Sequence, residues 1–340
     1  TAALPADYKQ ALVALAMAPQ MLDEKKYEEL VNDFIEQFAD YPDGYSARAR
    51  IEMSKQLFAE ADRDMQTAIA KSGNKADAYY SYARLMYDKE TLLPDVPYAE
   101  WSLDKVVEMA QKAFETDPQP LYNYLQYQAK YMQKKYQEAY DGFISLTKTQ
   151  FRSPNIFHEA ALCKKEMGAP IDEVISLVDS AIMSVDTLRL NEAAPYLIIR
   201  GGLLDEAGKY RDAVFDYARA EILMQENLSA EFYYGREQLE IKAKMYQQAL
   251  IDINHAIRLD SQEPFYYAEK ASLLLRLNMK EEAVDVGRQC VGIAPEYSEG
   301  YLVLGIALVT SGKKEEGLQN LQKAKELGNE QAEGMILKYQ

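Results

Sequence analysis

The residues best suited to acid–base or metal chemistry are few and scattered. Of the two histidines, only His255 has an acidic neighbour on the same predicted helix face, Asp252, three residues earlier. A metal site there would need two further protein ligands, and we predict that His158 is a packing residue. The sequence has no GxGxxG, P-loop, GxSxG, HExxH or EF-hand loop. We therefore expect no catalytic site, no cofactor and no metal.

Aromatic and arginine side chains at helical spacing indicate binding instead. Tyr80, Arg84 and Tyr87 stand at i, i+4 and i+7, which places them on one face of a helix. Tyr and Arg are enriched at binding hot spots because they combine a large contact area with hydrogen bonds. The alternative is that these tyrosines pack against neighbouring helices, as we expect for Tyr79 and Tyr82. Further candidates for the same binding role are Tyr122, Leu125 and Met132, and, later in the chain, Tyr234, Gln238, Phe265 and Arg276.

The composition describes an acidic, helix-favouring protein. The 340 residues carry a formal net charge of −16 and include 26 tyrosines. Nucleic-acid binding is disfavoured, because a phosphate backbone requires clustered Lys and Arg. Cys163 and Cys290 share no CxxC spacing and lie far apart in the repeat array described next, so we predict two buried thiols rather than a disulfide. No apolar run reaches the ~18 residues that a membrane-spanning helix requires.

The elements that must position these side chains repeat with a period near 34 residues. Small residues recur at two places in each unit, and Ala249, Ala283 and Gly317 are spaced 34 apart. A small residue lets a neighbouring helix approach closely, so each unit is predicted to be a helix pair that stacks on the next. The first small position is occupied by Leu30, Ala61, Val106, Ala139, Val174, Ala213, Ala249, Ala283 and Gly317, and the second by Gln37, Ala68, Ala113, Leu146, Ala181, Ala220, Ala256, Cys290 and Ala324.

This pattern resembles the tetratricopeptide repeat. Two stretches carry the resemblance most clearly. They are 264–297, with Tyr267, Ala271, Leu274, Ala283, Cys290 and Pro295, and 298–331, with Tyr301, Leu304, Gly305, Leu308, Gly312, Leu321 and Ala324. The resemblance implies an all-α, right-handed superhelical solenoid of about nine antiparallel helix pairs. In that family the first helix of each pair lines a concave groove, and Tyr80, Arg84 and Tyr87 match positions that look into it.

The repeats are expected to form one solenoid over residues 1–340. Two spacings are too long, which predicts an insertion at 89–100 in the third repeat and a shorter one near 186–195. Such insertions map to surface loops that are either functional or the result of drift in a tolerant loop. The predicted repeats lie near 11–41, 42–75, 76–120, 121–154, 155–193, 194–229, 230–263, 264–297 and 298–331, followed by a capping helix at 332–340.

The resemblance implies a non-catalytic scaffold that binds a peptide or protein segment in the groove. The alternative is an accessory or oligomerisation module that presents a substrate to a catalytic partner. The family's carboxylate clamp for chaperone tails needs Lys and Asn at positions that hold Ser46 and Arg50, or Tyr80 and Arg84, in this chain, so chaperone co-factor activity is not expected.

Localisation rests on resemblance alone. The chain begins at Thr1 and is similar to bacterial cell-envelope members of the family, so we expect export to the periplasm or cell envelope after removal of a signal peptide. A cytoplasmic scaffold is the alternative. The triplet Asn227-Leu228-Ser229 also matches a glycosylation acceptor, a match that is frequent by chance.

Overall fold

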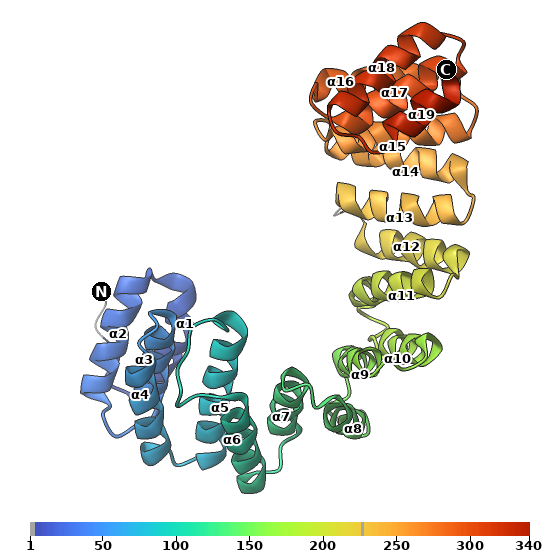
Figure 1. Cartoon of the computed structure of the whole chain (residues 1–340). Helices are drawn as coiled ribbons and strands as arrows, with labels where there is room; N and C mark the ends of the chain where they lie inside the picture. Colours follow the sequence, from blue (N-terminus) through green and yellow to red (C-terminus); the bar gives the residue numbers. More distant parts are fainter. Residues whose placement is uncertain (1–3, 226–227) are drawn as a thin grey trace. The chain divides into compact units, whose positions relative to one another are not determined.

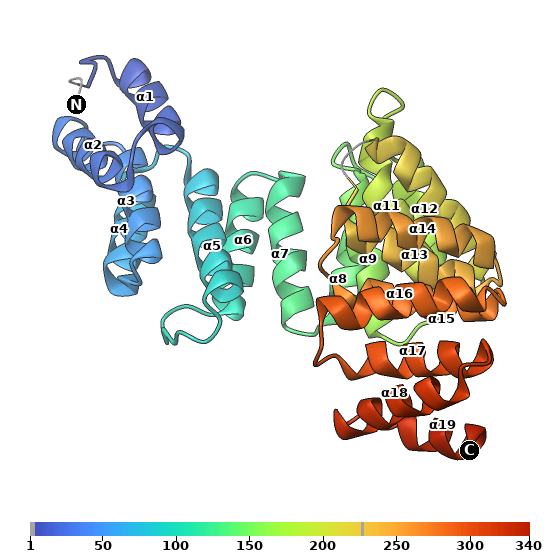
Figure 2. The same ribbon diagram turned by 90° about the horizontal axis from the view of Figure 1, so that it is seen from above.

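The computed structural model describes residues 4–225 and 228–340, and within them it contains helices and no strand. The chain divides into two compact units, residues 1–184 and 185–340. In both, consecutive helices pack as antiparallel pairs (Figures 1 and 2). The predicted all-α repeat fold is confirmed.

Each unit contains several helix pairs. The first has α1 Tyr8–Met21, α2 Glu24–Gln37, α3 Asp43–Ser54, α4 Phe58–Lys71, α5 Lys75–Leu92, α6 Leu103–Thr116, α7 Pro120–Met132, α8 Tyr136–Leu146, α9 Pro154–Glu166 and α10 Ile171–Met183. The second has the 3₁₀ helix η1 Leu190–Ala193, then α11 Ala194–Glu206, α12 Tyr210–Met224, α13 Ala230–Lys242, α14 Tyr246–Leu259, α15 Pro264–Arg276, α16 Lys280–Ile293, α17 Ser298–Thr310, α18 Lys314–Glu326 and α19 Ala332–Tyr339.

The turns within most pairs are closed by one residue in the left-handed region. Gly208 has φ +72°, and its successor Lys209 donates its N–H to the carbonyl of Leu204 at 2.8 Å, which closes α11. Several repeats make this turn without glycine: Lys134 and Lys244 hold φ values of 61° and 60°. A side chain in this conformation costs roughly 1–2 kcal/mol, so these turns are held by the packing of the helices that they join.

The small positions form the helix–helix contacts, as predicted. Ala61, Ala139, Ala249 and Ala283 are all fully buried. The first repeat is the exception, because Gln37 is exposed and donates to the carbonyl of Pro5 at 2.9 Å. In the later repeats the small positions are the fourth and eleventh residues of the second helix, whereas Leu30 and Gln37 are the seventh and fourteenth residues of α2. The eleventh residue of α2 is Phe34, which is fully buried.

The insertion predicted at 89–100 lengthens α5 and then folds back on the repeat. Helix α5 runs to Leu92, and a loop connects it to α6 (Figure 2). Just after the insertion, Trp101 is 3% exposed and its indole donates to Asp62 at 2.8 Å. Phe58 and Tyr98 surround the ring, with centroids 5.8 and 5.4 Å away. The end of this loop is therefore part of the core.

The ends of the array differ in character. At the C-terminus, α19 packs on α18 with Met335 and Ile336 against the last core cluster, which confirms the predicted cap. At the N-terminus, α1 leaves Val13 and Met17 more than half exposed. Near the predicted insertion at 186–195, η1 and the preceding turn leave Leu188 exposed.

Candidate protein-binding groove

The first helices of three successive pairs form a hollow surface in the first unit. A cavity of about 430 Å³ and another of about 260 Å³ share Asp43, Ser46 and Ser81, so they form one continuous groove. Its walls come mainly from α1, α3 and α5. The lining residues are Leu12, Leu15, Ala16, Pro19 and Tyr27 at one end, and Asp40, Tyr41, Lys71, Asn74, Asp77 and Ala78 at the other.

The groove has an apolar end and a polar end, with one unengaged cation between them. Arg50 is exposed on α3, and no carboxylate of the described residues pairs with it. Two aspartates of the groove are engaged by tyrosines: Asp43 accepts from the Tyr8 hydroxyl at 2.5 Å, and Asp77 accepts from the Tyr122 hydroxyl at 2.6 Å. Burial, and then the bond to Asp43, raise the pKa of Tyr8 far above its usual range. Arg50 is therefore available to an anionic group.

The predicted residues of α5 extend this surface by one turn. Arg84 lies three residues after Ser81, forms a 2.9 Å ion pair with Asp88, and stacks on Tyr87 with its guanidinium 5.7 Å from the ring centroid. Tyr80 and Tyr87 are half-buried, and both pack on the core cluster below. Of the three predicted residues, only Arg84 is exposed. Tyr80 and Tyr87 partly pack against neighbouring helices, which is the alternative role given above for these tyrosines.

The comparable set on α7 is placed differently from the prediction. Leu125 is 1% exposed and Tyr122 is 4% exposed. Leu125 is a core residue, and Tyr122 packs on Tyr80 at 5.2 Å between ring centroids. Met132 is half-buried at the end of α7. Neither Leu125 nor Tyr122 can offer contact area to a partner, so this set does not form the predicted surface.

A polar network that the sequence did not reveal lies on α7 and α9. Glu159 accepts hydrogen bonds from the Tyr124 hydroxyl and the Gln128 amide, both at 3.2 Å. Asn155 donates to the Tyr124 oxygen at 2.6 Å. The charge of Glu159 raises the pKa of Tyr87, after burial as the larger cause, so this network approaches the end of α5. The spacing of its members, 31 to 35 residues, follows the repeat and would have indicated the network.

The second predicted set, in the second unit, consists of two aromatic and two polar residues. Tyr234 packs against Phe265 with ring centroids 5.1 Å apart. Gln238 donates to Glu237 at 2.7 Å, and Arg276 is exposed at the end of α15. Glu237 is fully buried, and desolvation raises its pKa to about 7. None of these four residues lines the two cavities described above, which belong to the first unit.

A recurrent ion pair holds the two helices of a pair together. An arginine on the first helix forms two hydrogen bonds with an aspartate sixteen residues later on the second, as Arg48 does with Asp64 at 2.6 and 2.8 Å. Arg200 with Asp216, and Arg236 with Asp252, repeat the arrangement. Bidentate pairing fixes both distance and orientation, so these pairs set the register of the helices that carry the groove.

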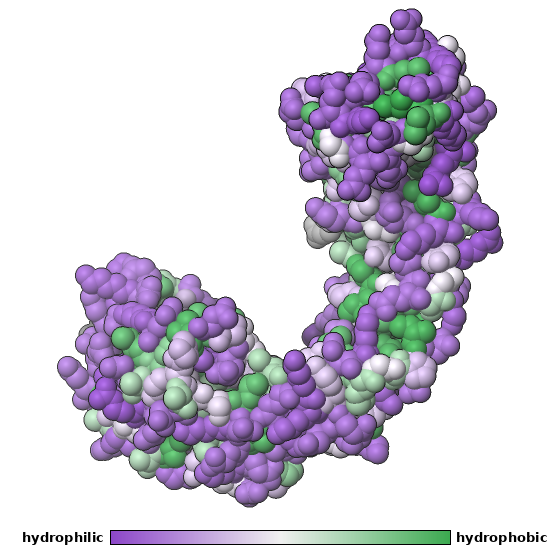
Figure 3. Space-filling model, in the orientation of Figure 1, coloured by the Kyte–Doolittle hydropathy of each residue, from purple (hydrophilic) through white to green (hydrophobic). Residues whose placement is uncertain are grey.

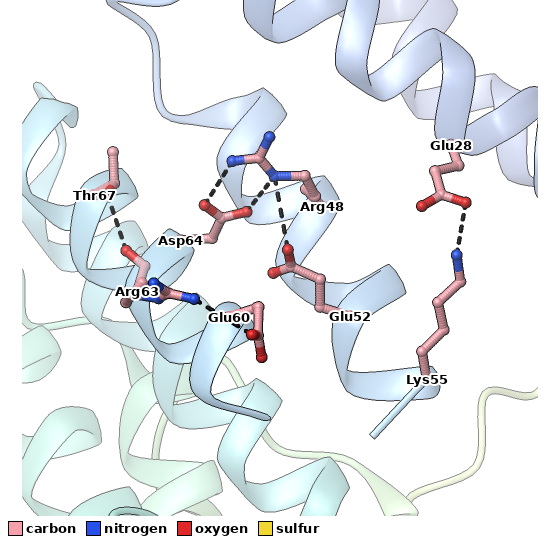
Figure 4. Close-up of polar contacts among 8 residues, drawn as sticks. All are labelled: Glu28, Arg48, Glu52, Lys55, Glu60, Arg63, Asp64 and Thr67. Carbon is pink, nitrogen blue, oxygen red and sulfur yellow. Dashed lines mark hydrogen bonds and ion pairs between the residues drawn. The ribbon is translucent and has the colours of Figure 1, made fainter. Parts of the chain in front are cut away.

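Two of these pairs include a second carboxylate, four residues after the arginine. Figure 4 shows Arg48 between Asp64 and Glu52. Desolvation, followed by the charge of Asp64, raises the pKa of Glu52 to about 7. At the second site desolvation and then Asp252 raise the pKa of Glu240 to about 8. Both Glu side chains are therefore largely protonated in mildly acidic solution.

The remaining residues that could carry out chemistry have packing or hydrogen-bonding contacts instead. His255 packs on Tyr233 with centroids 4.7 Å apart, and Asp252 is bonded to Arg236. No cluster of metal-ligating residues occurs in the described parts of the chain. Cys163 and Cys290 are buried and free, as predicted, and burial raises their pKa values to about 12 and 11. Asn227, of the glycosylation triplet, lies outside the described residues.

Comparison with known proteins supports the repeat family. The chain matches no family profile. It is 30% identical over 112 residues to small glutamine-rich tetratricopeptide repeat-containing protein 2 of Mycosarcoma maydis, which is 33% of this chain and 29% of that protein. It is 31% identical over 98 residues to the Saccharomyces cerevisiae protein of the same name. That match covers 28% of this chain and 28% of that protein. The chain therefore spans less than a third of either relative.

These matches fall on a chain whose helix pairs bury a small residue at the same two positions in repeat after repeat. The chain has the tetratricopeptide-repeat fold. Solved structures that resemble it include YrrB, described as having an unusual peptide-binding site. It is 14% identical, has a TM-score of 0.46, and covers 58% of this chain and 97% of its own. A tetratricopeptide repeat protein from Parabacteroides merdae is 19% identical and has a TM-score of 0.43. The match covers 77% of this chain and 98% of that protein. Superpositions this loose carry no functional information.

Proposed function

We propose that this protein is a non-catalytic scaffold that binds an extended segment of another protein in the groove of α1, α3 and α5. The observation that carries the proposal is the continuous hollow in which an apolar end, a polar end and the unpaired Arg50 lie side by side. An extended peptide fits such a surface, because alternate side chains can occupy the apolar end while a carboxylate reaches the arginine.

Arg84 extends the same site. It lies one turn from Ser81, and its ion pair with Asp88 is half-exposed. Exchange of an exposed intramolecular partner for a ligand carboxylate costs little, since such ion pairs contribute at most about 1 kcal/mol. The segment therefore has apolar side chains towards α1 and acidic groups towards Arg50 and Arg84.

The groove can be tested before the partner is known. A photo-crosslinking amino acid is placed at Ser46 or Ser81 in the groove, and at Arg63 on α4 as the control. Arg63 is well exposed and does not line the groove. We expect both groove positions to label the same partner at one segment, and Arg63 to label none of it. Equal labelling from Arg63, or no adduct from either groove position, would refute the assignment of the site.

A further inference from the structure

The outer face of two neighbouring second helices has an unusual composition. On α12, Phe215 is 63% exposed and Ile222 is 74% exposed. On α14, Ile251 is 57% exposed. Large apolar side chains in such positions lose contact with water only when something covers them. Figure 3 shows apolar patches of this kind interrupting the polar surface of the second unit.

These residues occupy equivalent places in successive repeats. Helix α12 begins at Tyr210 and α14 at Tyr246, so Phe215 and Ile251 are each the sixth residue of their helix. Ile222 and Arg258 are likewise equivalent. Because consecutive helix pairs stack in register, equivalent positions face the same side of the repeat array. We call this row of residues the outer stripe. It consists of Arg211, Phe215, Arg219 and Ile222 on α12, with Ile251 and Arg258 on α14.

The same position is polar in the two following repeats. The sixth residue of α16 is Asp285 and that of α18 is Gln319, and both are exposed. The fold therefore does not require an apolar residue at this place. An ordinary solvated face would continue the polar pattern, so the apolar residues of α12 and α14 need a separate explanation.

The charge of the outer stripe opposes that of the whole protein. Arg211, Arg219 and Arg258 are exposed, and no carboxylate of the described residues pairs with them. The exposed acid nearest in sequence is Asp212, while Glu221 is engaged by Arg236 at 2.5 Å. On a chain with a net charge of −16, three unpaired arginines beside apolar side chains define a local site for an anionic, apolar ligand.

We propose that the outer stripe is a docking surface for an acidic amphipathic helix of a partner protein. The apolar face of such a helix covers Phe215, Ile222 and Ile251, and its flanking carboxylates pair with the arginines. An anionic membrane fits less well, because it would repel a protein of this net charge. The surface lies outside the groove of the first unit, so it goes beyond the function proposed above.

The test uses the full chain and a defined probe. The probe is a fluorescein-labelled synthetic helix with leucines at i, i+4, i+7 and i+11 and glutamates at the flanking positions; a scrambled peptide of the same composition is its control. We expect the wild type to bind the helix and not the scrambled peptide. Phe215→Ser with Ile251→Ser, and separately Arg211→Glu with Arg219→Glu, should each weaken binding at least about tenfold.

Matched variants make the result decisive. Val13→Ser with Met17→Ser removes apolar residues of similar exposure from α1, and should leave both the affinity and the thermal midpoint unchanged. Arg50→Ala should also leave the affinity unchanged, which separates this surface from the groove. The same variants are also tested for binding to phosphatidylglycerol vesicles. The proposal is overturned if the wild type does not bind the helix or if the outer-stripe variants bind it equally well. It is also overturned if those variants lose vesicle binding but keep helix binding.

Discussion

Replacement of Glu240 by glutamine should remove a loss of folding stability that the second unit suffers as pH rises. Glu240 is 4% exposed, and one of its carboxylate oxygens has no hydrogen-bond partner among the described residues. Arg236 is the adjacent cation, but it is already bonded to Asp252 and Glu221. Besides burial, which is the largest cause, the charges of Asp252 and Glu237 both raise the pKa of Glu240, while Arg236 lowers it. Glu240 is therefore stable in this site only when it holds a proton.

The sign and size of the effect follow from its pKa. Burial, and then Asp252, raise the pKa of Glu240 from an ordinary 4.5 to about 8. Between these values the folded state binds more protons than the unfolded state, so the free energy of unfolding falls as pH rises. The shift corresponds to at most roughly 5 kcal/mol. Because the proton is shared with Asp252 and the site can relax, we expect a loss of about 2–4 kcal/mol between pH 5 and pH 9.

Glutamine keeps the shape and the hydrogen-bonding capacity of the protonated acid but cannot ionise. Urea unfolding, followed by circular dichroism from pH 5 to pH 9, should show Glu240→Gln equal to wild type at pH 5 and more stable at pH 9. Glu330→Gln, at an exposed residue of the turn before α19, should match wild type throughout. A difference between Glu240→Gln and wild type that does not change with pH would refute the assignment of the proton to this site.

Three further substitutions test the packing. Gly317→Ala places a methyl group 2.8 Å from the carbonyl oxygen of Gly305 and should lower the free energy of unfolding by roughly 1–3 kcal/mol, whereas Gly334→Ala, with no atom within 4 Å, should not; urea titration separates the two. Lys244→Gly should stabilise by roughly 0.5–1 kcal/mol, because φ is +60° there, and a lower urea midpoint would contradict this. Trp101→Ala should cost about 3–5 kcal/mol by the same titration, and a smaller loss would mean that the loop after α5 is not anchored by its indole.

The repeat architecture was predictable from sequence because small residues have few reasons to recur every 34 positions other than close helix packing. Ala249 and Ala283 are buried in the contacts that this spacing implied. The register failed in the first repeat, where no small residue marks it. The fourth and eleventh residues of α2 are Tyr27 and Phe34, so the predicted positions Leu30 and Gln37 lie three residues too late, and Gln37 is exposed.

The face of each first helix was harder to predict than its existence. Helix α7 has tyrosines on several sides, so apolar periodicity does not distinguish the core face from the groove face. Leu125 therefore appeared as a groove residue although it belongs to the core. The arginine–aspartate pairs were missed for a different reason. Arg48 and Asp64 lie on different helices, and their sixteen-residue separation becomes informative only when it is compared with the same separation in other repeats.

The groove in the first unit is tested most directly by calorimetric titration of its ligand. The peptide is the segment labelled from Ser46 and Ser81, and it is titrated into wild type and into Arg50→Ala with Arg84→Ala. Both arginines are exposed, so the thermal midpoint should be unchanged. The affinity should fall at least about tenfold, since charged contacts of this kind contribute roughly 1–3 kcal/mol. An unchanged affinity in a fully folded double variant would contradict the account.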